Sequence, residues 1–206
     1  MPSETFLRLS KDKRDTLLKA AKKEFQNHLI EEVSINQIIK NAGISRGSFY
    51  MYFKDKEDLY SYLLKQFRED LYTSIMEELQ KAKGDFLKAS EVLFDQMLEF
   101  CMQEENKAFF QNVFFNLKYT SDKISEWKPS KEMRKKQKEE VLTYIDPSLY
   151  TLDREEILEA FGLVMIITKT SMTHIFMNPK DREKEKAIYK RRLHMLKYGI
   201  CKKEEN

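Results

Sequence analysis

Lys56 is the residue whose type and position most clearly indicate a chemical role. Asp55 is expected to cap a helix that begins here, and Glu57 and Asp58 fall in its first turn, where the helix dipole favours anions. A cation at that end opposes the dipole by roughly 0.3 to 1 kcal/mol. It would be well placed if an external phosphate lay against the helix end. We therefore predict phosphate contact, with a solvated surface lysine as the alternative.

A short helix is predicted over residues 34–42, upstream of this site. Ser34 is a suitable N-cap, and Gln37 lies three positions later, where it would complete a capping box. Val33 and Ile38 have the spacing of a hydrophobic staple. The start of this helix is therefore well specified by the sequence.

A second short helix is predicted directly after the first. Gly43 suits the left-handed conformation that ends a helix, and Ser45 offers a new N-cap. Ile44 and Phe49 are spaced as a second staple. Two short helices joined by so tight a turn, with a third starting at Asp55, indicate a DNA-reading helix-turn-helix.

A longer helix, from about residue 11 to residue 27, is expected to cover the two short ones. Its apolar stripe consists of Leu17, Leu18, Ala21 and Phe25. Residues 1–56 carry 11 Lys and Arg against 7 Asp and Glu, a charge of +4, while the whole chain carries +3. The excess positive charge therefore lies in residues 1–56, called the head below. This agrees with nucleic-acid binding without demonstrating it.

The fold class is predicted to be all-α, with about nine helices. The chain has only 5 Gly and 4 Pro, and its apolar residues recur at helical spacing nearly everywhere. Beyond the head, helices are expected over residues 55–83, 86–103, 107–119, 130–144, 153–177 and 181–198, with a looser stretch over 120–129.

The last two predicted helices carry more apolar surface than the other helices of residues 55–206 (the body) can cover. The helix over residues 153–177 is apolar on nearly every side around Phe161 to Ile167. We therefore predict a homodimer held by a four-helix interface, formed mainly by these two helices.

The protein is expected to be soluble, cytoplasmic and associated with the nucleoid. The longest near-uniform apolar run, Ala160–Ile167, is far below the roughly 18 residues that span a bilayer. The N-terminus lacks an apolar signal core. Cys101 and Cys201 stand alone, which is consistent with a reducing compartment.

Enzymatic activity is not predicted. His28, His174 and His194 are widely separated, and the sequence contains no HExxH, GxSxG or glycine-rich phosphate loop. No residues have the spacing of metal ligands, so neither a metal nor a cofactor is expected.

The segment Ala42 to Leu59, AGISRGSFYMYFKDKEDL, resembles the DNA-binding domain of TetR-family transcriptional regulators. The resemblance covers about 50 residues. Three positions depart from the usual pattern: Leu29 replaces Gly, Ile39 replaces Ala and Val33 replaces Thr. The resemblance implies a helix-turn-helix domain over residues 1–54 and a helical effector-binding and dimerisation domain over residues 55–206.

The resemblance also implies which side chains face DNA. The second short helix would present Arg46, Gly47, Ser48, Tyr50 and Tyr52, and the first would bring Ser34 and Asn36 close. Arg46 is suited to a bidentate contact with guanine, while Asn36 could read an adenine edge or hold a phosphate. Ser48, Tyr50 and Lys56 suit phosphate anchoring, and Tyr52 suits either role. Gly47 would allow close approach of the backbone to DNA, or would be a tolerated first-turn glycine.

The resemblance further implies an effector pocket in the body for a small lipophilic or aromatic molecule. Candidate lining residues are Phe94, Met97, Phe100, Phe110, Phe114, Trp127, Tyr144, Met165 and Met172. Apolar side chains at helical spacing are more often ordinary core, so core packing is the alternative for each of them.

The predicted function is a DNA-binding transcriptional regulator, a repressor that a lipophilic effector releases from a palindromic operator. Two alternatives keep the same fold. One is an effector-independent DNA-bound adaptor, similar to nucleoid-occlusion division inhibitors. The other is a helical lipophile carrier whose head no longer binds DNA.

Overall fold

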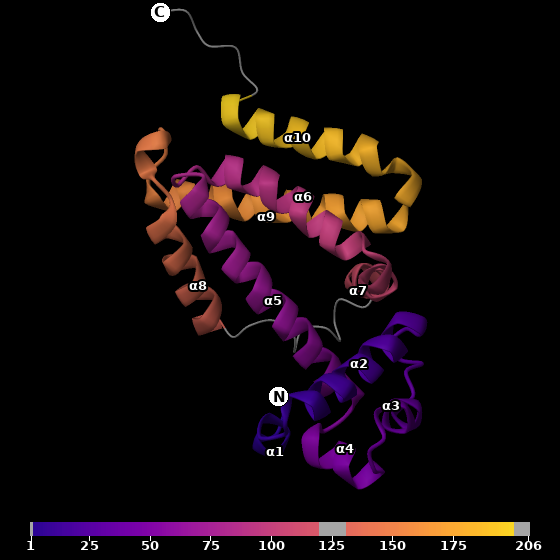
Figure 1. Ribbon diagram of the computed structural model, residues 1–206. Helices are drawn as coiled ribbons and strands as arrows, with labels where there is room; N and C mark the ends of the chain where they lie inside the picture. The colour runs from indigo at the N-terminus through magenta and orange to yellow at the C-terminus, as the bar shows by residue number, and fades with distance from the viewer. Residues whose placement is uncertain (1, 120–130, 200–206) are drawn as a thin grey trace, which may run out of the picture. The chain divides into compact units, whose positions relative to one another are not determined.

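The computed structural model describes residues 2–119 and 131–199, and every regular element in these ranges is helical. The predicted all-α fold is confirmed. The described residues form ten α-helices, one more than the nine or so expected, because a four-residue helix, α1 (Glu4–Leu7), precedes the first predicted helix (Figure 1).

Two compact units make up the chain, and each takes residues from two stretches. Among the described residues, the first unit comprises 2–70 and 101–119, and the second comprises 71–100 and 131–199. The helices of the first unit are α1, α2 (Lys11–Asn27), α3 (Ile35–Ala42), α4 (Arg46–Tyr52), the first part of α5 (Lys56–Lys81) and α7 (Glu104–Tyr119). The remainder of α5 belongs to the second unit.

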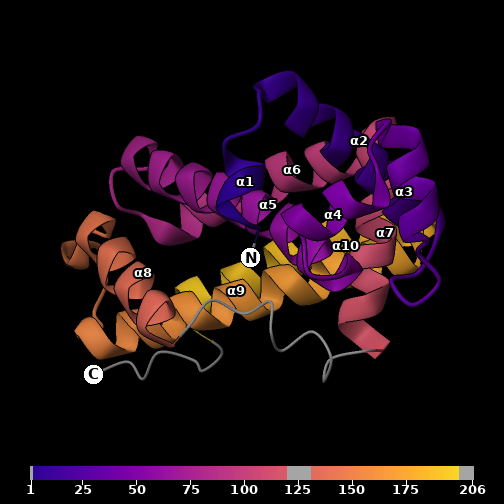
Figure 2. The ribbon, with the colours of Figure 1, turned by 90° about the horizontal axis from the view of Figure 1, so that it is seen from below.

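The core of the first unit is formed where α2 covers the two short helices. Leu17 and Phe25 of α2 are buried, as are Ile38 of α3 and Phe49 and Phe53 at α4. The turn between α3 and α4 can be followed from below in Figure 2. The apolar stripe predicted for α2 is confirmed at Leu17, Ala21 and Phe25.

Helix α7 belongs to the same unit as the head because it packs against α2. The side-chain amide of Asn112 donates to the carbonyls of Phe25 and Gln26, at 2.9 and 3.1 Å. These carbonyls lie in the last turn of α2, where a helix has no partners of its own. The compact unit therefore extends past residue 54, and the functional division between residues 54 and 55 remains a prediction.

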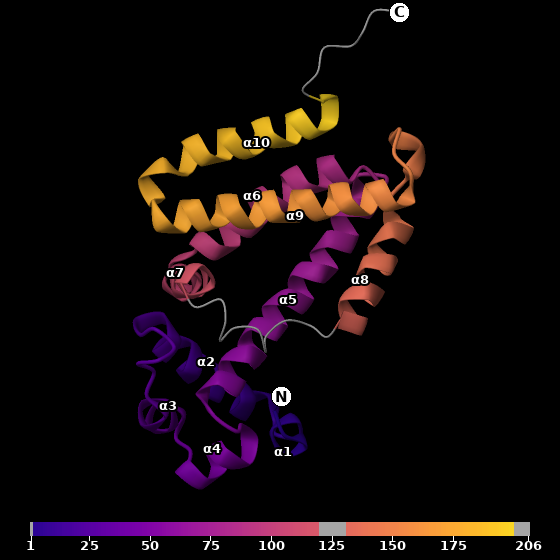
Figure 3. The same cartoon turned by 180° about the vertical axis from the view of Figure 1, so that it is seen from behind.

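The second unit contains α6 (Phe86–Met102, up to residue 100), α8 (Lys131–Tyr144), α9 (Arg154–Met177) and α10 (Arg182–Tyr198). Helices α9 and α10 run side by side (Figure 3). Tyr189 of α10 joins them to α6, since its ring stacks on Phe94 at 3.8 Å and its hydroxyl donates to the carbonyl of Ser90. Two 3₁₀ turns, Pro147–Leu149 and Pro179–Asp181, lead into α9 and α10.

A buried polar cluster fixes α9 against α10. Glu185 of α10 accepts hydrogen bonds from the hydroxyl of Ser171 at 2.9 Å and from the guanidinium of Arg192 at 3.1 Å. Glu185 and Ser171 are both buried. A buried carboxylate needs such partners, so the charge of Glu185 is satisfied within the unit.

By length and composition, helix α9 is apolar enough to cross a membrane. Its qualifying window has a mean hydropathy of 1.3, and 28% of that window is buried. The continuous apolar run Ala160–Ile167 is shorter than this window. A single polar residue ends such a run, but it lowers the mean hydropathy of a window only slightly. Core helices of water-soluble proteins have the same composition, and the exposed apolar residues of α9 need a cover of some kind.

Gly84 is a glycine that the fold requires. Its φ is +81°, and a Cβ built on it would collide with the backbone nitrogen of Asp146. Gly43 also has a positive φ, +65°, but nothing lies within 4 Å of its Cβ position. A substitution at Gly43 therefore causes backbone strain alone, whereas a substitution at Gly84 causes backbone strain and a steric collision.

We expect Gly43→Ala to lower the free energy of unfolding by about 1 to 2 kcal/mol, the cost of a left-handed conformation. Gly84→Ala should cost more, because the same strain is joined by displacement of the segment at Asp146. Urea denaturation of the two variants measures the difference. Equal losses would contradict the collision at Gly84.

Candidate DNA-binding surface

The start of α4 is set by Ser45, as predicted. The Ser45 hydroxyl accepts a hydrogen bond from the backbone N–H of Ser48 at 3.0 Å, and Gly43 adopts the left-handed conformation that ends α3. The staple residue Phe49 is fully buried. Local sequence therefore determines where this seven-residue helix begins and which side faces the core.

Ser34 caps α3, but the predicted capping box is wrong. The Ser34 hydroxyl accepts from the N–H of Gln37, whereas the Gln37 side chain donates to Asn41. The backbone N–H of Ser34 instead donates to the buried carboxylate of Glu24 at 3.1 Å. A carboxylate from α2 has replaced the local partner, and it ties the start of α3 to α2.

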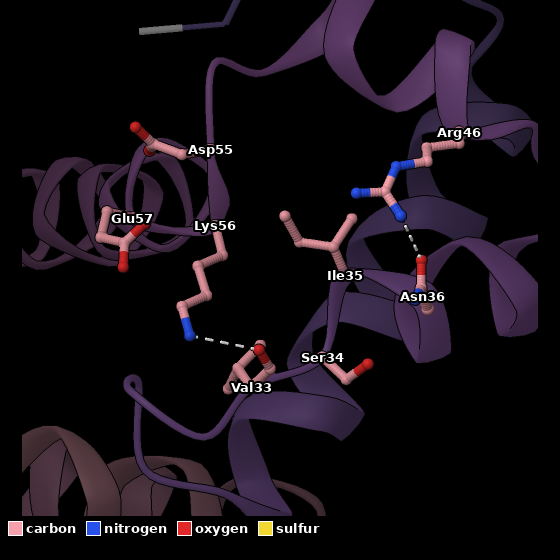
Figure 4. A pocket seen from close by; sticks show the side chains of 8 residues that line it. All are labelled: Val33, Ser34, Ile35, Asn36, Arg46, Asp55, Lys56 and Glu57. Carbon is pink, nitrogen blue, oxygen red and sulfur yellow. Dashed lines mark hydrogen bonds between the residues drawn. The ribbon is translucent and has the colours of Figure 1, made fainter.

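The Arg46 guanidinium lies between α3 and α4 (Figure 4). It donates to the side-chain oxygen of Asn36 at 3.0 Å and to the hydroxyl of Tyr50 at 3.5 Å, and it lies 5.7 Å from the centre of the Tyr50 ring. A guanidinium has five N–H donors, so donors remain for a ligand. Asn36 and Tyr50 thus hold an exposed, fixed positive charge at the start of α4.

Lys56 has a role that the sequence did not reveal. Its ammonium group donates to the backbone carbonyls of Glu31 at 2.6 Å and Val33 at 3.2 Å. The start of α5 is thereby tied to the segment between α2 and α3. Asp55 caps α5 as predicted, because its carboxylate accepts from the N–H of Asp58 at 2.7 Å.

An open pocket of about 320 Å³ lies between these groups. Its lining residues are Val33, Ser34, Ile35, Asn36, Arg46, Asp55, Lys56 and Glu57 (Figure 4). Four of the eight predicted DNA-contacting residues, Ser34, Asn36, Arg46 and Lys56, are brought together here. The pocket combines two cations, Arg46 and Lys56, with two carboxylates, Asp55 and Glu57, at the starts of α3, α4 and α5.

The exposed side of α4 adds the remaining predicted residues and one that was missed. Tyr50 and Met51 are 46% and 57% exposed, while Ser48 and Tyr52 are half-buried. An exposed apolar side chain on a recognition helix can contact a thymine methyl group. Met51 lies two positions after the buried Phe49, so helical phase could have placed it on the exposed side.

Gly47 has no structural need to be glycine within the protein. A Cβ at this position would meet only the Ser45 hydroxyl, at 3.8 Å. Alanine would fit here and would favour the helix. Close approach of a binding partner such as DNA therefore explains the glycine better than packing within the protein does.

The predicted effector residues come from both compact units. Phe110 and Phe114 lie buried in the first unit, and the other described candidates lie in the second. Of those, Phe94 and Met172 are fully buried, Met97 and Tyr144 are half-buried, and Phe100 and Met165 are exposed. Trp127 lies outside the described residues. Phe94 is packed as core through its Tyr189 stack, and the rest stay predictions.

The described part of the chain contains no group of three or more His, Cys, Asp or Glu side chains that could hold a metal ion. Burial raises the pKa of the Cys101 thiol to about 12, so the nucleophilic thiolate is strongly disfavoured.

Two family descriptions match the chain. Residues 17–63 match the bacterial regulatory proteins of the tetR family, and residues 85–200 match the tetracyclin repressor-like C-terminal domain. The second match alone covers more than half of the chain, and the first covers the whole of α3 and α4.

Curated relatives match about half of the chain. The transcriptional regulator AcrR of Shigella flexneri is 27% identical over 107 residues, which are 52% of this chain and 50% of AcrR. An HTH-type transcriptional regulator of Staphylococcus aureus (strain USA300) is 29% identical over 104 residues, 50% of this chain and 55% of that protein. The chain thus spans about half the length of the curated relatives it matches.

Solved structures match over nearly the full length. A TetR-family regulator from Syntrophomonas wolfei has a TM-score of 0.68 and 19% identity, covering 94% of this chain and 99% of that one. Thermus thermophilus FadR, a repressor in complex with lauroyl-CoA, has a TM-score of 0.62 and 17% identity, covering 93% and 97%. At these identities the likeness shows the fold, and together with the two family matches it shows that the chain belongs to the TetR family of bacterial transcriptional regulators.

Proposed function

We propose that this regulator binds a near-palindromic operator as a homodimer and represses transcription from it. The observation that carries the proposal is the exposed guanidinium of Arg46, held by Asn36 and Tyr50 at the start of a capped recognition helix. Two such helices would enter successive major grooves, about 34 to 36 Å apart. The protein would act in the cytoplasm, where the chromosome lies.

Self-association is supported by apolar side chains that remain exposed on α9 and α10. These side chains are Leu163, Met165, Ile166, Met195, Leu196 and Tyr198. The buried cluster of Ser171, Glu185 and Arg192 joins the two helices. A second copy of the same helix pair would bury the exposed apolar side chains in a four-helix interface.

Release by a small lipophilic effector is the regulatory part of the proposal. Helix α5 contributes residues to both compact units, so a ligand that moves its second half would also act on the half that carries Lys56. Such a ligand must prefer the state that does not bind DNA, and couplings of about 5- to 150-fold are typical. Since FadR of Thermus thermophilus was solved with lauroyl-CoA, acyl thioesters are the first probes to test.

An effector-independent adaptor that stays on DNA is the second candidate. The burial of Phe94 favours it, because this predicted pocket residue packs as core against Tyr189. The lipophile carrier is disfavoured by Arg46 and Tyr50, which stay exposed together at the recognition helix. Operators selected from genomic fragments, followed by anisotropy titrations with lauroyl-CoA and aromatic compounds, distinguish the three candidates: a repressor loses DNA, an adaptor keeps it and a carrier never binds it.

Arg46→Ala and Lys56→Ala should weaken operator binding in different ways. Loss of Arg46 should remove about 1 to 3 kcal/mol of discrimination at one base pair, because a base contact is lost. Loss of Lys56 should weaken binding to all sequences and reduce the salt slope by about 1, because a phosphate contact is lost. Anisotropy titrations over a range of salt concentrations measure both effects.

Lys88→Ala is the matched control, since Lys88 is an exposed cation of α6 in the second unit. It should leave discrimination and the salt slope unchanged. If Lys56→Ala lowers stability without changing the salt slope, the lysine acts only through the carbonyls of Glu31 and Val33, and its phosphate role is wrong.

Gly47→Ala should stabilise the free protein and weaken DNA binding. Alanine raises helix stability by up to about 1 kcal/mol over glycine, and the Cβ has room within the chain. The added methyl group would instead meet the DNA backbone. Urea denaturation and operator titration test the two halves. A variant that gains stability and keeps full operator affinity would make Gly47 a merely tolerated glycine.

Ile166→Asp should dissociate the homodimer. Ile166 is 61% exposed in the single chain, and burying an unpaired carboxylate in an apolar interface is unfavourable. Sedimentation equilibrium should show monomers and operator affinity should fall. Leu149→Asp, at a residue 51% exposed outside α9 and α10, should remain dimeric. A wild-type protein that sediments as a monomer would refute this interface.

A further inference from the structure

The N-terminal segment contacts the end of the recognition helix. The Ser3 hydroxyl donates to the carbonyl of Met51 at 2.6 Å, and the Ser3 backbone N–H donates to the carbonyl of Tyr52 at 2.9 Å. The same hydroxyl accepts from the N–H of Phe6 and so caps α1. One serine therefore joins the start of α1 to the end of α4, and the two helices lie side by side (Figures 1 and 3).

These bonds supply hydrogen-bond donors to the carbonyls at the end of α4. The last carbonyls of a helix have no partners within it, and a helix as short as α4 is marginal without tertiary contacts. Met51 and Tyr52 are its last two residues, and both of their carbonyls are satisfied by Ser3. The start of α4 is fixed by Ser45 and its end by Ser3.

An aromatic cluster fixes the same end from the apolar side. Phe6 is fully buried, and its ring centre lies 4.7 Å from Phe53, 5.4 Å from Tyr62 and 6.0 Å from Tyr52. Tyr52 ends α4, Phe53 follows it and Tyr62 belongs to α5. Phe6 thus packs into the junction between the recognition helix and α5.

We propose that residues 3–6 form an N-terminal clasp that holds the end of α4 in the position required for operator binding. The inference rests on the proposed DNA-binding role of α4 and names positioning residues for it. Ser3 and Phe6 carry no charge, so the clasp acts on the helix and not on phosphates. The tetR-family match begins at residue 17, which places the clasp before the matched domain.

The test compares Phe6→Ala with Leu7→Ala in the full-length protein. The two residues are neighbours in α1, but Phe6 is fully buried and Leu7 is 49% exposed. If α4 is correctly placed only about a tenth of the time without the ring, operator affinity falls about tenfold. The salt slope should stay unchanged, because no phosphate contact is lost. Leu7→Ala should bind like the wild type.

Hydrogen exchange in the absence of DNA provides the second measurement. The backbone amides of residues 49–53 should exchange faster in Phe6→Ala than in the wild type, while those of α10 should not change. If these amides exchange at the wild-type rate, the clasp is refuted whether or not DNA binds. If exchange accelerates but no genomic fragment binds the wild-type protein, the clasp stands and the proposed function fails.

Ser3→Ala is the milder variant in case Phe6→Ala does not fold. It removes the hydroxyl bond to Met51 but keeps the backbone bond to Tyr52, so a smaller loss of affinity is expected. Ser3→Thr retains the hydroxyl and should restore binding. If Ser3→Ala binds like the wild type, or if Phe6→Ala flattens the salt slope, a purely positional clasp is wrong.

Discussion

The DNA-binding surface depends on holding a seven-residue helix in place. Helix α4 is too short to be stable alone, so its position must come from its neighbours. Ser45 satisfies its first turn, Phe49 buries one side, and Ser3 bonds to the last two carbonyls. The residues that α4 offers to DNA take their positions from these contacts.

The polar groups proposed for DNA contact already have partners in the free protein. Arg46 is bound to Asn36 and Tyr50, and Lys56 to the carbonyls of Glu31 and Val33. Such bonds restrict side-chain rotation before DNA arrives, which lowers the entropy lost on binding. Arg46 keeps three of its five donors for a ligand, whereas Lys56 keeps one of its three.

Local signals predicted the head well, and contacts between distant residues explain the differences. The bounds of α2, α3 and α4 follow from caps, Gly43 and helical periodicity. Helix α1 was missed because four residues carry no periodicity. The capping box failed because Glu24, ten residues earlier, competes for Ser34.

The place of α7 was missed because Asn112 contacts carbonyls more than 80 residues away. The pocket candidates stay predictions except Phe94, which packs as core through its stack on Tyr189.

The two sides of α9 explain its unusual composition. Ser171 faces Glu185 and Arg192 in a buried cluster, which consumes the polar groups that α9 and α10 share. Leu163 and Ile166 lie on another side and stay exposed. A helix in a membrane would gain nothing from a charged cluster fixed to a helix as rich in Lys and Arg as α10. An exposed apolar side beside a buried polar cluster is what the proposed interface between two copies requires.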